Sequence, residues 1–82
     1  MKPKKVPEQY LEVDQKLIQI GEKVRKLRKE KSPNYENFAT AYNINKVTLN
    51  RIERGESVST KLFFNVLLKL EITSLEDFFN GL

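Results

Sequence analysis

The chain has no cysteine and no histidine. These absences exclude zinc-finger ligation, thiol nucleophiles, Ser-His-Asp triads and imidazole acid–base catalysis. Most acidic residues stand singly, without the paired carboxylates of a catalytic cleft. We therefore expect a protein that is not an enzyme and that uses no metal, no cofactor and no evident small-molecule ligand.

Long apolar runs are also missing. The longest, residues 62–64 and 66–68, are interrupted by Asn65 and Lys69 and are too short to cross a membrane. The basic start of the chain is not followed by the apolar segment of a signal peptide. These features predict a cytoplasmic protein that does not enter a membrane.

Glycine and proline are scarce, at three residues each among 82, which excludes fibrous and low-complexity chains. A hydrophobic content of 39% with 32% charged residues is typical of one small globular domain. The net charge is +4, and residues 1–61 hold 14 basic and 8 acidic side chains whereas residues 62–82 hold one and three. Positive charge attracts polyanions, but alone it identifies no partner.

The first apolar pattern predicts one long helix, because its residues recur three and four positions apart. We expect residues 1–9 to form a flexible basic arm and residues 10–82 to form the domain. The helix starts either at Pro7 or at Asp14 as an N-cap, and Ser32 before Pro33 ends it. Its apolar stripe consists of Tyr10, Val13, Leu17, Ile20, Val24 and Leu27.

Four shorter helices are predicted after it, with no strand. Asn34 caps the second, residues 35–42, after which Asn43 tolerates the left-handed backbone of a tight turn and Ile44 points into the core. The third spans residues 46–54.

The last two helices lie in the C-terminal part of the chain. Ser59 or Thr60 caps the fourth, which runs to Leu70. Residues 73–76 read as a capping box for a fifth helix that ends at residues 80–81.

The third predicted helix, capped by Asn45 and ended by Gly55, has two distinct faces. At about 100° per residue, Leu49 and Ile52 share one side. The residues on the separate outer arc are Lys46, Val47, Asn50, Arg51 and Arg54. Arg and Lys hydrogen-bond guanine O6 and N7, Asn pairs with adenine, and Val contacts a thymine methyl. The arc therefore suits the DNA major groove, and the alternative is an ordinary solvated face.

Three segments together carry a family resemblance: IGEKVRKLR at residues 20–28, ENFA at 36–39 and INKVTLNRIERG at 44–55. With the Leu-rich helix that follows, they resemble the lambda-repressor-like or XRE family over roughly residues 17–80. RIERG is the most specific part. The resemblance implies an all-α, five-helix helix-turn-helix bundle that binds double-stranded DNA.

The resemblance also implies roles for single residues. Arg28 and Glu53 would form a structural ion pair that ties the first helix to the third. Tyr35 and Asn43 depart from the family pattern, and Tyr35 fits packing against Pro33 as well as contact with DNA. The implied base-reading residues are Lys46, Val47, Asn50 and Arg51, and the implied phosphate contacts are Tyr35, Asn45, Thr48, Arg54 and Lys61.

The fourth predicted helix is apolar around most of its circumference, so it is either central to the core or buried against a partner. Family members commonly bind two-fold symmetric operators as dimers. We expect a homodimer through part of this helix with Phe78, Phe79 and Leu82, or else a fully internal core. A coiled coil through the stripe from Tyr10 to Leu27 is the other arrangement, although core packing explains that stripe better.

The leading function is sequence-specific DNA binding by a transcriptional regulator, a repressor because no activation segment is visible. Two alternatives stay open: the antitoxin of a toxin–antitoxin pair, and a protein-interaction module that has lost DNA binding. With Val47 beside Arg51, we expect a half-site that contains thymine next to guanine.

Overall fold

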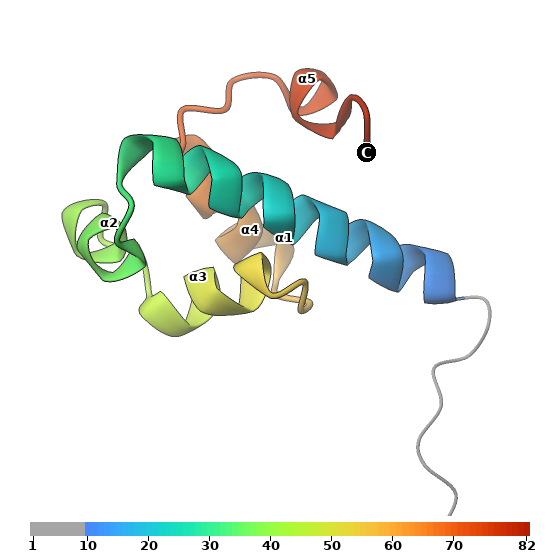
Figure 1. Cartoon of the computed structure of the whole chain (residues 1–82), viewed down its shortest axis with the longest axis horizontal. Helices are drawn as coiled ribbons and strands as arrows, with labels where there is room; N and C mark the ends of the chain where they lie inside the picture. The colour runs from blue at the N-terminus through green and yellow to red at the C-terminus, as the bar shows by residue number, and fades with distance from the viewer. Residues whose placement is uncertain (1–9) are drawn as a thin grey trace, which may run out of the picture.

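The computed structural model describes residues 10–82, and the predicted arm of residues 1–9 lies outside this range. The five helices are α1 (Leu11–Lys31), α2 (Tyr35–Ala41), α3 (Lys46–Glu53), α4 (Thr60–Lys69) and α5 (Leu75–Phe79) (Figure 1). Residues 10–82 contain no strand. The prediction of an all-α protein with five helices is therefore confirmed for this part of the chain.

The start of α1 lies between the two predicted positions. Tyr10 precedes the first residue, Leu11, and no side chain caps the helix there. At the other end Ser32 takes an extended conformation before Pro33, and its N–H donates to the carbonyl oxygen of Arg28. The predicted end of the helix is thus confirmed.

Asparagine side chains start both short helices, as predicted. The Oδ1 of Asn34 accepts from the N–H groups of the second and third residues of α2, and the Oδ1 of Asn45 does the same for α3. Between the helices Asn43 has a φ of 54°, in the left-handed region that the turn requires. Gly55 ends α3 with a φ of 80°. All four local predictions are confirmed.

Serine side chains start the last two helices. The Oγ of Ser59 accepts from the N–H of Leu62 and caps α4. For α5 the predicted capping box is wrong by one residue: the cap is Ser74, not Thr73, and its Oγ accepts from the N–H of Asp77. Ser74 has the extended backbone that an N-cap needs.

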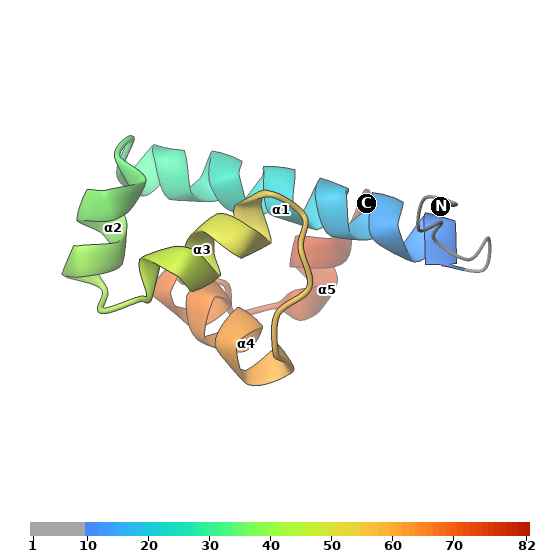
Figure 2. The ribbon, with the colours of Figure 1, turned by 90° about the horizontal axis from the view of Figure 1, so that it is seen from below.

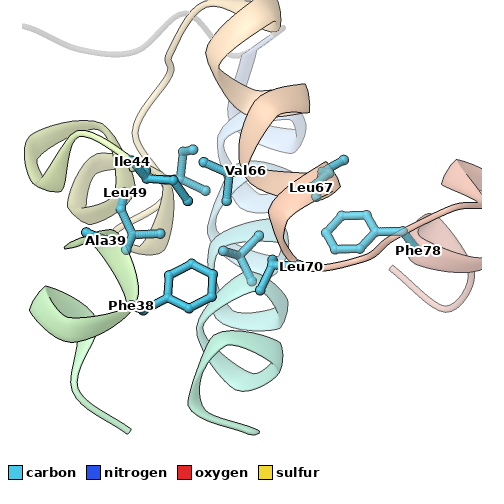
Figure 3. Packing of buried hydrophobic residues seen from close by; sticks show 10 residues of the cluster. Phe38, Ala39, Ile44, Leu49, Val66, Leu67, Leu70 and Phe78 are labelled. Atoms are coloured by element: carbon cyan, nitrogen blue, oxygen red, sulfur yellow. The ribbon is translucent and has the colours of Figure 1, made fainter. Parts of the chain in front are cut away.

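The core lies where α1, α2, α3 and α4 meet, and α5 adds one ring to it. Figure 3 shows Phe38, Leu49 and Val66 pointing into the same volume from three helices, with Phe78 closing one side. Ile44 is buried as predicted. The buried hydrophobic side chains are Val24, Phe38, Ala39, Ile44, Leu49, Ile52, Val66, Leu67, Leu70 and Phe78.

Only the second half of the predicted α1 stripe packs on this core. Val24 is fully buried and Ile20 and Leu27 are partly buried, whereas Tyr10 and Val13 are about half exposed. In both views the N-terminal end of α1 extends beyond the other helices (Figures 1 and 2). Core packing therefore explains the stripe from Ile20 onward but not its beginning.

The apolar circumference of α4 divides into an inner and an outer part. Val66, Leu67 and Leu70 are buried, whereas Phe64 and Leu68 are exposed. The outer part of α4 is thus an apolar surface on the bundle.

Among residues 10–82, none of the helices has both the length and the apolar composition that a membrane crossing requires.

The predicted dimer patch needs one correction. Phe78 is only 2% exposed because its ring packs into the core against Phe63, so it cannot face a partner copy. Phe79 remains exposed, and Leu82 is partly buried.

Candidate nucleic-acid interface

Helix α3 is held by its inner face, directly over α1. Leu49 is fully buried and Ile52 is 3% exposed, as the predicted division of this helix requires. Gly21 of α1 lies beneath the end of α3. A Cβ there would meet the carbonyl oxygens of Ile52 and Glu53 closer than van der Waals contact. The two backbones therefore touch, and the position of α3 depends on this glycine.

An ion pair ties the same two helices together. Arg28 donates from Nε to Oε2 of Glu53 at 2.9 Å and from Nη2 to Oε1 at 2.8 Å. Its Nη1 donates to the carbonyl oxygens of Ser32 and Pro33 at 3.2 and 2.8 Å. Arg28 therefore also holds the segment that leads into α2, so α2 and α3 are both fixed relative to α1.

The outer face of α3 presents the four residues expected to read bases. Lys46, Val47 and Arg51 are exposed, and Val47 is the most open apolar side chain of this helix, at 62%. Asn50 is half-buried, and its Oδ1 is buried without a hydrogen-bond partner. A buried amide oxygen without a partner is uncommon.

Two hollows lie beside this face and share Tyr35, Asn50 and Arg54. The larger, of about 450 Å³, is lined by Tyr35, Glu36, Lys46, Val47, Asn50 and Arg54. The smaller, of about 240 Å³, is lined by Arg25, Arg28, Tyr35, Asn50, Glu53 and Arg54. The structure thus gathers residues from α1, the start of α2 and both ends of α3 around one polar surface.

The residues expected to contact phosphate are only partly gathered there. Tyr35 and Arg54 line both hollows, and Tyr35 also packs against the core. Asn45 uses its Oδ1 to cap α3. Thr48 is half-buried, and Lys61 is exposed in the first turn of α4; neither lines a hollow.

Sequence reasoning missed two carboxylates at this surface. Glu36 of α2 lies 3.3 Å from Lys46, and Glu56 lies 3.9 Å from Arg51 and 3.0 Å from Arg54. Helical periodicity could not reveal these pairs, because each carboxylate lies outside α3. The missed contribution of Arg25 from α1 has the same cause.

The described residues offer hydrogen-bond donors and charges at this surface. Among residues 10–82, no three acidic side chains gather closely enough to hold a metal ion. The arrangement suits recognition of a polar, charged surface. Comparisons with protein-family models, with curated proteins and with solved structures found no match to the chain.

Proposed function

We propose that this protein binds double-stranded DNA sequence-specifically through a lambda-repressor-like helix-turn-helix, with α2 and α3 as its two helices, and acts as a transcriptional repressor. One observation carries the proposal: α3 is anchored by Leu49 and Ile52 while Lys46, Val47 and Arg51 stand exposed on its outer face. A short helix held in this way presents its polar side chains in one direction, as insertion into a major groove requires.

The chemistry of the outer face supports base recognition. Arg51 and Lys46 suit the O6 and N7 acceptors of guanine, and Asn50 suits adenine. The adjoining hollows are lined by Tyr35 and Arg54, whose hydroxyl and guanidinium suit phosphate oxygens. Phosphate contacts would set the register of α3 on the duplex, and base contacts would select the sequence.

Selection of binding sites from random duplex DNA tests the proposal. We expect an enriched motif, and Arg51→Ala should lose about 1–3 kcal/mol of binding free energy and relax the preference at one base position. Arg54→Ala and Lys61→Ala should weaken binding to every sequence and flatten its salt dependence. Lys16→Ala, which removes an exposed cation near the start of α1, is the matched control and should change neither.

The proposal fails if no motif is enriched and Arg51→Ala leaves binding unchanged. In that case a protein-interaction module becomes the proposed function.

We also propose that two copies associate through the outer side of α4. Phe64, Leu68 and Leu75, here called the α4 patch, are exposed and line one hollow of about 240 Å³. An apolar patch around a hollow suits a self-complementary interface, because protruding side chains of one copy can fill the hollow of the other. A two-fold dimer would place one α3 on each half-site of a symmetric operator.

A further inference from the structure

Each cation of α3 and its C-terminal cap is paired with a carboxylate from outside the helix. Lys46 Nζ lies 3.3 Å from Oε2 of Glu36, at the start of α2. At the other end Glu56 lies between two arginines, with Oε1 at 3.9 Å from Nε of Arg51 and Oε2 at 3.0 Å from Nη2 of Arg54. The three positive charges of α3 and its cap therefore have two negative charges beside them.

The backbone fixes the position of Glu56. Its N–H donates to the carbonyl oxygen of Arg51 at 2.8 Å, and the N–H of Gly55 donates to that of Ile52 at 3.0 Å. Gly55 has the left-handed backbone, with a φ of 80°, that turns the chain back over the end of α3. The backbone of Glu56 is thus hydrogen-bonded to the end of α3, and its carboxylate lies next to Arg51 and Arg54.

These pairs contribute little to folding, since exposed ion pairs are worth about 0–1 kcal/mol. Their larger effect is on the affinity of the protein for a polyanion such as DNA. Affinity for any duplex grows with the number of phosphates that cations neutralise, and a carboxylate beside each cation opposes this term. Contacts to base edges depend on hydrogen-bond geometry, so the carboxylates weaken these contacts less than they weaken the attraction to phosphates.

The geometry at Arg51 adds a second effect. The carboxylate of Glu56 lies 3.9 Å from Nε of Arg51, beyond hydrogen-bond distance, so it acts on this guanidinium through charge and leaves both terminal amino groups for another acceptor. Bidentate reading of guanine requires a guanidinium held in a defined plane. Because the charge of Glu56 attracts the guanidinium from its Nε side, it favours orientations in which the terminal amino groups point away from the carboxylate.

We infer that Glu56 is a specificity-determining positioning residue. It orients Arg51 for base reading, and its charge, like that of Glu36, weakens the sequence-independent part of binding to any duplex. The inference rests on the proposed function.

The test compares the duplex enriched by selection with an unrelated duplex of equal length. Glu56→Gln should tighten binding to the unrelated duplex, steepen the salt dependence by about 0.9, the value of one added phosphate contact, and lower the ratio of the two affinities about tenfold. Glu36→Gln should tighten both complexes but keep the base preference of Arg51. Glu76→Gln, the same charge change on α5, should keep the ratio.

Glu56→Asp separates charge from position. It keeps the charge but withdraws the carboxylate, so the salt dependence should stay near that of the unaltered protein while the preference at the base read by Arg51 relaxes. If Glu56→Gln and Glu76→Gln show the same ratio of the two affinities, while the unaltered protein still binds its enriched duplex, this inference is overturned and the proposed function stands. If no duplex is enriched at all, the proposed function itself fails.

Discussion

The guanidinium of Arg28 and the carboxylate of Glu53 form a forked pair, with 2.9 Å between Nε and Oε2 and 2.8 Å between Nη2 and Oε1. Both side chains are largely buried, at 4% and 11% exposed. Since the remaining amino group of Arg28 donates to the carbonyl oxygens of Ser32 and Pro33, one side chain joins α1, α3 and the connection to α2.

Removing one partner of this pair should destabilise the fold strongly. Glu53→Ala leaves the charge of Arg28 buried without compensation, and we expect the free energy of unfolding to fall by about 3–5 kcal/mol. Urea denaturation measures the loss. The double variant Arg28→Met with Glu53→Leu should lose less, because it removes both charges and keeps apolar volume. Additive losses would contradict this coupling.

Gly21→Ala should also destabilise the protein, against the usual preference of helices. In an open helix interior this change is expected to gain about 0.5–1 kcal/mol. Here the new methyl group meets backbone oxygens of α3, so we expect a loss of about 1–3 kcal/mol by urea denaturation. Lys26→Ala, on the exposed side of the same helix, is the control and should be nearly neutral. A stabilised Gly21→Ala variant would show that α1 and α3 do not touch there.

The boundaries of most helices were predictable because local chemistry sets them. Asn34 and Asn45 cap helices with their own side chains, and Asn43 and Gly55 adopt backbone conformations that few other residues accept. The cap of α5 was placed one residue early, because Thr73 and Ser74 both have capping hydroxyls and only the backbone distinguishes them.

Features that depend on distant segments were not predictable. The α1 stripe predicted a helix, but its periodicity could not show that Val24 is buried while Val13 stays exposed. The carboxylates of Glu36 and Glu56 reach α3 only after the turns on either side of it have formed. The outer face of α3 was predictable because it follows from one helix alone.

The ion pair between Lys31 and Glu71 should make a small, pH-dependent contribution to stability. The hydrogen bond from Lys31 lowers the pKa of Glu71, and the same bond raises the pKa of Lys31. The lowered carboxyl pKa means a contribution that is present at neutral pH and lost as the pH falls through that pKa. The raised lysine pKa means a contribution that is lost as the pH rises through it.

Glu71→Gln should therefore lower the urea midpoint slightly at neutral pH and should not lower it in acid. Denaturation at a series of pH values measures the difference, with Glu76→Gln as a control for general charge effects. Both side chains of the pair are on the surface, so the change should be small. An equal effect of Glu71→Gln at every pH would argue against the pair.

The dimer should depend on the α4 patch. Leu68 is its most exposed member, at 69%, so Leu68→Lys should introduce charge into the interface without altering the core. We expect sedimentation equilibrium to show a dimer for the unaltered protein and a dissociation constant raised at least tenfold for the variant. Leu11→Lys makes the same change at an exposed site near the start of α1 and should leave the dimer intact. A monomer at high micromolar concentration would exclude the interface.

Val47 gives the most direct test of how α3 meets DNA, because it is an apolar side chain that the protein leaves open. We expect it to contact the methyl group of a thymine beside the guanine read by Arg51. Replacing that thymine with uracil removes only the methyl, so binding should weaken by about 0.8 kcal/mol, roughly fourfold. Val47→Ala should reduce this difference, whereas uracil outside the enriched motif should have no effect. If every thymine of the motif tolerates uracil, α3 does not enter the groove with Val47 toward the bases, and Arg51 would have to read from another orientation.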